Sequence, residues 1–392
     1  MTERLYYTDP YLTEFDAEVL RVEVHDGRPA AVLDRTAFYP TSGGQPFDTG
    51  RLDTAAVIDV IDGDDGVIRH VFEGSIEPGP VRGTIDWSRR FEHMQQHTGQ
   101  HLLSAAFDRV SGARTESFHL GTIESTIDLN RTLSPADIER VEDEANRVVW
   151  ENRVVGIRFA DAEEAAKLPL RKEPARSGTL RIIEIAGFDM SACGGTHVAR
   201  TGAIGSIVVS SSERFRGGTR IEFVCGVRAL RRHRALRDAV AACVRLVSVL
   251  PEQLPEGIEK LQADGKETKK QVKDLQARLA TFEASALAGG AEVRGGVQVV
   301  VAALEGWDQN GLKAIASSIA MRPLHVAVLF GLPSPAAAVV ARAQDASVDC
   351  GALLKTLVGR FGGKGGGRPD LAQGGGLQGT ANEMVSFARE LF

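Results

Sequence analysis

The sequence predicts an α+β protein with four successive parts: a small β-barrel-like domain (1–88), an α+β domain (89–227), a helical hairpin or coiled coil (228–290) and a C-terminal α/β domain (291–392). Short strand-like runs between Gly and Asp turns fill the first part, helical and strand-like patterns mix in the second, and the third is helical almost throughout. A chain of 392 residues with 43% hydrophobic content is long enough for several cored domains.

In the first part, strand-like runs flank turn sequences. EVLRVEV and AAVLD stand on either side of HDGRP, VIDVI and VIRHVF stand on either side of DGDDG, and VRGTIDW follows. This spacing predicts a small antiparallel barrel or curled sheet. Within it, FYPTSGGQPFDTG contains Gly43 and Gly44, which permit positive φ and a close approach of the backbone to a ligand. An ordinary glycine turn is the alternative.

The second part opens with a helical pattern rich in histidine. FEHMQQHTGQHLLSAAFDRV places His93, His97 and His101 at i, i+4 and i+8, on one helix face. SPADIERVEDEANRVVW predicts another helix, with Ser134 as N-cap and Pro135 at the first helical position. RVVGIRF, LRIIEIAG, AIGSIVVSSSERF and TRIEFVCG are typical of strands, and the second of them runs into FDMSACGGTHVARTG. Helices packed on mostly antiparallel strands predict an α+β domain.

The third part predicts two antiparallel helices. RALRRHRALRDAVAACVRLVSVL forms one long pattern, and PEQLPEGIEK interrupts it with two prolines. Apolar residues at alternating spacings of three and four then continue to Phe282, although Gly265 and Thr268 weaken this seam. A basic stripe on the first helix is either a phosphate-contacting surface or a solvated face. Its candidate contacts are Arg231, Arg232 and Arg234.

The fourth part alternates VQVVVAAL, a helical DQNGLKAIASSIAM and LHVAVLFGL, which is βαβ-like. The sequence GRFGGKGGGRPDLAQGGG follows, and its flexible backbone amides, with Lys364 and Arg368, could cradle phosphates. A flexible linker is the alternative for this Gly-rich loop. The helical pattern LQGTANEMVSFARELF after it argues against a linker.

Composition constrains compartment and redox state more than it constrains partners. No apolar run reaches membrane-spanning length, and MTERLYYTDPYLTEF lacks the basic and apolar regions of a secretory signal, so we expect a cytoplasmic protein. Four scattered cysteines are too few for a disulfide framework, so we expect reduced thiols. The formal charge of −6 is mild and leaves the partners open.

Two pairs of potential metal ligands stand out. His97 and His101 are four apart on a helix, and Cys193 and His197 are four apart on a glycine turn. Each pair alone is a weak signal, because a single histidine or free cysteine usually has a structural role. Together they could complete a tetrahedral Cys/His₃ shell for zinc, with His93 as a rival ligand by spacing. The sequence argues against a zinc protease, because no glutamate lies between the two helical histidines, as the motif HExxH would require.

These motifs carry a family resemblance. HTGQHLLSAAF followed by CGGTHVARTGAIGSI, with FYPTSGGQPFDTG upstream, resembles the editing domain of alanyl-tRNA synthetases and of freestanding alanyl-tRNA editing proteins. FGGKGGGRPDLAQGGG resembles the C-terminal globular domain of the same synthetases, which DHH-type phosphoesterases share, so the resemblance covers essentially the whole chain. Because the sequence starts at the editing module and shows no ATP-binding class II core, we expect a long freestanding editor that acts in trans.

The resemblance implies hydrolysis of the ester between serine or glycine and the terminal adenosine of alanine tRNA, by a zinc-dependent aminoacyl-tRNA deacylase. By motif, the positions that would hold one Zn²⁺ per chain are His97, His101, Cys193 and His197. The segment that resembles the aminoacyl pocket contains Thr36, Gly43, Gly44 and Gln45, with Thr36 at the position that meets the serine side chain. A dimer through the C-terminal region is compatible with the resemblance.

The sequence departs from the family pattern at two points. Ala192 precedes Cys193 where a proline is usual, and Thr41 and Ser42 stand where an acidic residue or glycine is frequent. These changes alter turns rather than ligands, so they bear on the detailed shape of the pocket.

The expected chemistry needs no dedicated nucleophile. An aminoacyl ester is already activated, so the site must orient one water and stabilise an oxyanion. Four protein ligands are typical of a structural zinc, whereas a catalytic zinc keeps an open position, and the sequence is compatible with both. The alternative function is a zinc-stabilised tRNA-binding module without turnover. A phosphoesterase would require an Asp-His-His metal motif, and no DHH occurs in the sequence.

Overall fold

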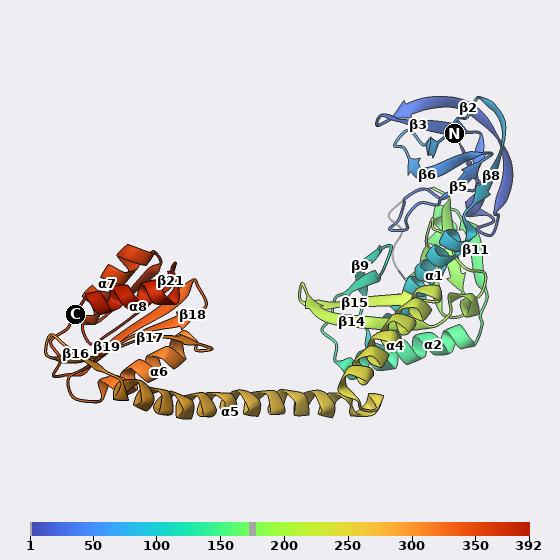
Figure 1. Cartoon of the computed structure of the whole chain (residues 1–392). Coiled ribbons are helices and arrows are strands. Elements are labelled where there is room, and N and C mark those ends of the chain that lie inside the picture. Colours follow the sequence, from blue (N-terminus) through green and yellow to red (C-terminus); the bar gives the residue numbers. More distant parts are fainter. Residues whose placement is uncertain (1, 172–177) are drawn as a thin grey trace. The chain divides into compact units, whose positions relative to one another are not determined.

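A computed structural model describes residues 2–171 and 178–392 of the chain (Figure 1). The chain divides into two compact units, Met1–Ala242 and Cys243–Phe392. The first unit therefore contains both the predicted barrel and the predicted α+β domain. Among the helices in the described ranges, none combines the length and the apolar character that a membrane span requires.

The first unit begins with a closed antiparallel barrel, as the turn spacing predicts. Its strands, in the order in which they pair around the barrel, are β2 (Glu14–His25), β3 (Arg28–Leu33), β7 (Ile68–Glu73), β6 (Ala55–Asp62), β5 (Gly50–Leu52) and β8 (Gly79–Ile85). Phe38, Leu52 and Ile68 are fully buried in its core. Before and between these strands lie β1 (Glu3–Arg4), the 3-10 helix η1 (Leu5–Tyr7) and β4 (Arg35–Thr36), and β1 pairs with β4 in parallel.

The α+β part of this unit packs two long helices against two antiparallel sheets. The helices are α1 (Trp87–Ser111) and α2 (Pro135–Trp150). The larger sheet has the order β14 (Ile207–Phe215), β15 (Gly218–Cys225), β10 (Ser125–Leu129) and β9 (Thr115–Leu120). The smaller sheet has the order β11 (Val155–Ala160), β12 (Leu180–Ile185) and β13 (Asp189–Ala192). Two short helices complete it, α3 (Ala162–Ala165) and η2 (Thr201–Ile204).

Local sequence explains where the two long helices begin and end. The Asp86 side chain accepts a hydrogen bond from the backbone of Arg89 at the start of α1, and Gly112 ends that helix with a φ of 62°. Ser134 caps α2 in a capping box with Asp137, as the sequence predicts. Met94, Leu102 and the rest of the apolar face of α1 pack in the shared core.

The third predicted part is helical. It contains α4 (Val227–Val247), the 3-10 helix η3 (Pro251–Gln253) and α5 (Leu254–Gly289). Most of α4 belongs to the first unit and α5 belongs to the second, so the antiparallel pairing of the two helices stays a prediction. In α5, only the small residues Ala280, Ala284 and Ala288 are buried, and they pack in the core of the second unit.

The second unit is a mixed six-stranded sheet with helices on both faces. Its strands, in spatial order, are β16 (Glu292–Arg294), β17 (Val297–Glu305), β18 (His325–Leu332), β19 (Ala336–Arg342), β21 (Leu371–Leu377) and β20 (Lys364–Gly367). The helices are α6 (Gln309–Ala320), α7 (Cys350–Phe361) and α8 (Ala381–Glu390). β17, α6 and β18 form the predicted βαβ unit, because β17 and β18 are parallel.

Alternation along β18 explains the two layers of helices. Val328 and Phe330 pack in one core with residues of α7 and α8, whereas Ala327 and Leu329 pack in another with residues of α6 and the end of α5. Figure 1 shows α7 and α8 on one side of the sheet and α6 on the other. Successive side chains of a strand point to opposite faces, so a strand buried on both sides is apolar throughout.

The prediction of a flexible Gly-rich loop is wrong. Its glycines form the antiparallel pair β20 and β21, with the chain turning between Arg368 and Leu371. A Cβ atom at Gly367 would lie 2.3 Å from the Cα of Ala372, and one at Gly365 would lie 2.6 Å from the Cα of Gly374. The glycines therefore permit close strand packing at the edge of the sheet.

Candidate metal centre

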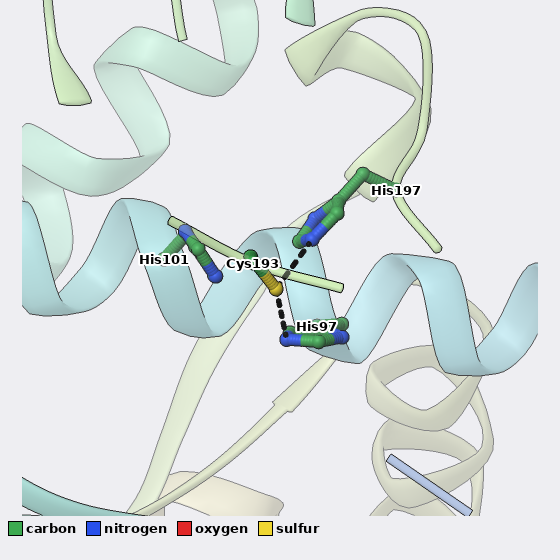
Figure 2. Close-up of side chains that lie close together, drawn as sticks. All are labelled: His97, His101, Cys193 and His197. Carbon is green, nitrogen blue, oxygen red and sulfur yellow. Dashed lines mark hydrogen bonds between the residues drawn. The ribbon is translucent and has the colours of Figure 1, made fainter. Parts of the chain in front are cut away.

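The structure brings together the two pairs of residues that the spacing singles out. His97 and His101 lie on one face of α1, and Cys193 and His197 lie on the turn that follows β13 (Figure 2). The Cys193 Sγ atom is 3.4 Å from His97 Nε2 and 3.3 Å from His197 Nε2. One potential ligand atom from each of the four residues lies within 4.8 Å of all the others.

Two glycines allow this close approach. A Cβ atom at Gly195 would lie 2.1 Å from His97 Cε1, so a larger residue there would push the turn away from the helix. A Cβ atom at Gly99 would lie 2.3 Å from Cys225 Sγ, so glycine also lets α1 sit close to β15. The glycines of HTGQH and CGGTH are therefore part of how the cluster is assembled.

Polar side chains contact the Nδ1 atoms of two of the imidazoles and so fix the orientation of these rings. The His97 Nδ1 atom is 2.8 Å from Gln45 Oε1, and the His101 Nδ1 atom is 3.3 Å from Asp189 Oδ2. Gln45 is itself fixed, because it accepts a hydrogen bond from the Thr196 backbone and donates one to the Thr196 hydroxyl. Both Nδ1 atoms therefore carry a proton, and both Nε2 atoms face the centre of the cluster.

The third imidazole has the same arrangement. The Thr98 hydroxyl donates to the Met94 carbonyl at 2.8 Å, so its oxygen acts as an acceptor towards His197 Nδ1 at 3.2 Å. The His197 Nε2 atom is left facing Cys193. All three histidines thus turn their Nε2 atoms towards one point, and histidine binds a metal through such a nitrogen once it is unprotonated. Burial acts to lower the pKa of His101, but Cys193 and Asp189 outweigh it and raise the pKa to about 9, so a metal that binds there displaces a proton from His101.

The charge state of the thiol agrees with this geometry. Burial acts to raise the pKa of Cys193, but the surrounding His97, His197 and His101 outweigh it, and the pKa lies well below its ordinary value. The thiolate is the form that binds metals. A tetrahedral site with bonds of about 2.0 to 2.3 Å separates its ligand atoms by about 3.3 to 3.8 Å. The two distances from Cys193 Sγ to histidine Nε2 lie in this range, and all four ligand atoms lie within 4.8 Å of one another, so the cluster could hold a metal ion.

The rival ligand lies outside the cluster. His93 is buried one helical turn before His97, and its Nδ1 atom has no hydrogen-bond partner among the described residues. Burial lowers the pKa of His93 to about 3, so this imidazole is neutral. It is absent from the set of converging ligand atoms within the described ranges.

The predicted glycine loop lies against the cluster. Gly43 and Gly44 have φ values of 53° and 82°, and the next residue, Gln45, is the one that contacts His97. A Cβ atom at Gly44 would lie 2.7 Å from the ring of Phe118, so the glycine is required for this close approach. The loop therefore joins the barrel to the metal centre.

A buried ion pair holds the loop to α1. Arg90 and Asp48 are both fully buried and pair with each other. Arg90 also donates to the carbonyls of Ala37 and Pro10, and the Tyr39 backbone donates to Asp48 at 2.6 Å. The helix that carries the histidines and the segment that carries the glycines are thus fixed relative to each other.

Thr36 is placed differently from the other pocket residues. It is fully buried in the barrel, and among the residues that the structure describes its hydroxyl contacts His70 at 2.8 Å and the Phe38 backbone at 3.1 Å. The His70 Nδ1 atom donates to the Ala31 carbonyl, and burial lowers the pKa of His70 to about 4. His70 Nε2 is therefore an acceptor, and the Thr36 hydroxyl donates to it.

The candidate phosphate contacts on α4 are partly engaged within the protein. Arg231 pairs with Glu92 at 2.7 Å, and Arg232 pairs with Glu124. Arg234 is exposed on the same helix. In the second unit Lys364 is exposed on β20, and Arg368 lies 3.4 Å from Asp370. The basic residues thus differ in how much of their charge the chain itself already neutralises.

Sequence reasoning missed several residues around the cluster: Thr98, Phe118, Arg181, Asp189 and Thr196. Arg181 donates from Nη1 to the carbonyls of Cys193 and Gly195, both at 2.8 Å, and so holds the ligand turn. An arginine within the apolar strand LRIIEI was a usable signal, because a buried charge requires partners.

Comparisons with known proteins match two domain families along the chain. The DHHA1 domain family matches residues 296–392, and the family "Threonyl and Alanyl tRNA synthetase second additional domain" matches residues 180–222. The chain is 36% identical to the alanine–tRNA ligase of Methanoregula boonei over 96% of its own length and 42% of that protein. It thus spans less than half the length of such ligases.

A second relative matches along nearly its whole length. The chain is 32% identical to the alanyl-tRNA editing protein AlaX-L of Pyrococcus horikoshii, over 95% of this chain and 94% of that protein. A solved structure, the C-Ala domain of Aquifex aeolicus alanyl-tRNA synthetase, aligns with 26% of this chain and 96% of its own at 23% identity and a TM-score of 0.25. With its cluster, its domain matches and this end-to-end similarity, the chain belongs to the family of long alanyl-tRNA editing proteins.

Proposed function

We propose that this protein is a trans-editing hydrolase that removes serine or glycine from mischarged alanine tRNA by ester hydrolysis. The proposal rests on the Cys/His₃ cluster. Polar side chains contact the Nδ1 atoms of its imidazoles, and the cluster lies next to a glycine loop with positive φ values. The relative named as an alanyl-tRNA editing protein covers almost the whole chain and supports the same activity.

Zinc is the proposed resident metal, one ion per chain, held by Cys193 and by Nε2 of His97, His101 and His197. When bound, zinc supplies a Lewis acid or fixes the shape of the pocket. The chain's own groups do the rest: Gln45, Asp189 and Thr98 hold the imidazole protons on Nδ1. The backbone at Gly43 and Gly44 lets a substrate approach without a side chain in the way.

The deciding experiment is a deacylation assay on alanine tRNA charged with serine, glycine or alanine. We expect multiple-turnover release of serine and glycine and sparing of the alanine ester. A protein that binds the charged tRNAs but releases no amino acid would instead be the zinc-stabilised tRNA-binding module.

Thr36 is proposed to discriminate serine from alanine. Its hydroxyl proton points to His70, and the Phe38 backbone uses one lone pair, so Oγ1 retains one acceptor site for a substrate hydroxyl. Thr36→Val should therefore lower the ratio of the rate of serine release to the rate of alanine release. The ratio should fall about tenfold for each 1.4 kcal/mol of discrimination between the two esters that is lost. Deacylation rates on tRNA charged with serine and with alanine measure this ratio. An unchanged ratio would show that another residue recognises the serine hydroxyl, and Gln45 would be the next candidate. Glycine has no hydroxyl, so its removal depends on another feature.

The second unit is proposed to strengthen tRNA binding through exposed cations such as Lys364 and Arg368. A fragment ending at Ala242 should fold and keep the zinc site but bind tRNA more weakly and with a smaller salt dependence. Equal affinity and salt dependence for fragment and full chain would exclude this role.

The same experiment has an internal control, a fragment that ends at Val227. This fragment lacks Arg228, which is 5% exposed, pairs with Glu92 and donates to the Gly121 carbonyl. Leaving these groups unpaired costs about 1–3 kcal/mol, so urea should unfold it at a lower concentration than the longer fragment. The first compact unit ends at Ala242, so the longer fragment keeps that unit whole.

A further inference from the structure

We propose that Phe118 is the surface on which the adenine base of the substrate's terminal nucleoside stacks. This inference rests on the proposed function, because it takes the substrate to be an amino acid esterified to adenosine. It identifies a substrate-binding residue that no motif in the sequence indicates, on an element that carries none of the proposed metal ligands.

The position of Phe118 in its sheet explains why the ring is accessible. β9 is the edge strand of the four-stranded sheet, and Phe118 pairs with Ile127 on β10, which pairs with Ile221 on β15. Ile127 and Ile221 are fully buried beneath α1, whereas Phe118 is 37% exposed. Phe118 therefore continues the apolar face of the sheet out to the solvent, where an edge strand has no further neighbour to cover it.

The ring lies beside the metal centre and is held in place. Its centroid is 6.1 Å from that of the His97 ring, with 39° between the two planes. The backbone of Gly44 abuts the ring edge, because a Cβ atom there would lie 2.7 Å from Phe118 Cε2. The glycine loop and His97 thus fix the orientation of the phenyl ring in the free protein, which lowers the entropy cost of binding a flat ligand.

Phe118 is one of the exposed residues next to the cluster. The four ligand residues are buried except for the half-buried Cys193, whereas Gly44, Phe118 and Gly194 beside them are exposed. These three residues thus offer solvent-exposed surface next to the cluster. Phe118 supplies the aromatic face among them, since the other two have no side chain.

The chemistry of the substrate makes such a face useful. The ester carbonyl and the adenine base belong to one nucleoside, so a carbonyl at the cluster places the base a ribose away. Stacking of a base on an aromatic side chain is sequence-tolerant, and its loss corresponds to about a 5- to 150-fold weaker interaction. The base would then be bound by the ring and the amino acid by the glycine loop.

The test compares two esters of serine, seryl-adenosine and serine methyl ester, on the zinc-loaded full-length protein. Phe118→Ala should raise KM for seryl-adenosine about 5- to 150-fold, with kcat changed by less than about twofold. KM for the methyl ester should not change, because that substrate has no base. Phe118→Trp should restore wild-type KM for seryl-adenosine. An equal loss on both esters would overturn the proposal, because it would show that the ring only packs the site.

Two further variants distinguish loss of base stacking from a general loss of folded structure. Phe118→Leu keeps an apolar side chain of similar bulk without an aromatic face, so it should behave like the alanine variant on seryl-adenosine. Phe159→Ala is the matched control, since Phe159 is 46% exposed on β11, the edge strand of the smaller sheet. It should leave both KM values unchanged. A leucine variant with wild-type KM for seryl-adenosine would also overturn the proposal.

A binding measurement separates this inference from the proposed activity. Calorimetry with adenosine that carries serine through a stable 3′-amide measures affinity without turnover. Phe118→Ala should weaken this affinity about 5- to 150-fold, whether or not the protein hydrolyses the esters. Hydrolysis by the wild type with unchanged amide affinity in the variant would refute the stacking role alone. Absence of ester hydrolysis with Phe118-dependent amide binding would refute the deacylase activity alone.

Discussion

Alanine in place of Cys193 should strip zinc from the purified protein and abolish deacylation of serine-charged alanine tRNA. Zinc sites with four protein ligands contribute about 10–16 kcal/mol, or about 3 kcal/mol per ligand, so losing the thiolate weakens binding by about a hundredfold or more. The turn itself should persist, because Arg181 holds it through the backbone carbonyls of Cys193 and Gly195. Metal content by mass spectrometry and zinc affinity by chelator competition measure the effect.

Cys243→Ala is the matched control, because Cys243 is an exposed cysteine on α4. It should retain one zinc per chain and full activity. Wild-type zinc content in Cys193→Ala would remove Cys193 from the shell and bring the neighbouring His93 into consideration as a ligand.

Leucine in place of Gln45 should reduce zinc affinity about 10- to 100-fold, the usual effect of removing the group that orients a metal-binding histidine. The change leaves two buried donors without partners, His97 Nδ1 and the Thr196 backbone amide. Each unpaired donor costs about 1–3 kcal/mol, so the free energy of unfolding should also fall. Chelator competition and urea unfolding measure the two effects separately.

Gln45→Glu distinguishes orientation of the histidine from simple filling of space. A carboxylate accepts from both His97 and the Thr196 amide, and the Thr196 hydroxyl can turn to donate to the second oxygen. Its negative charge is also favourable beside a zinc complex with one thiolate. This variant should therefore bind zinc within a few-fold of wild type, by the same general rule for such partners. Loss of zinc to the same extent in both variants would argue against the orienting role.

The residues of the Cys/His₃ cluster were predictable because their signal is local. A spacing of four on a helix places His97 and His101 on one face, and a glycine turn does the same for Cys193 and His197. The barrel and the cap of α2 were predictable for a similar reason, since turn residues and capping residues act within a few positions. The family resemblance of these motifs also agreed with the end-to-end match to an editing protein.

Spacing could not decide which distant segments meet. His97 and Cys193 are 96 residues apart, and His97 and Gln45 are 52 apart. Their contacts depend on how the barrel, α1 and the smaller sheet pack together. The fold decided that Gln45 contacts His97 while Thr36 contacts His70, although both belong to one predicted pocket segment.

The tertiary structure also decided the roles of residues whose local pattern suggested something else. Arg231 and Arg232 face carboxylates on other elements, and the glycines after α7 pack as paired strands. Phe118 lies in an ordinary strand, and its exposure follows only from the position of β9 at the edge of the sheet. A sequence pattern determines which face of an element a side chain occupies, whereas the partner of that face is set by packing between segments far apart in the chain.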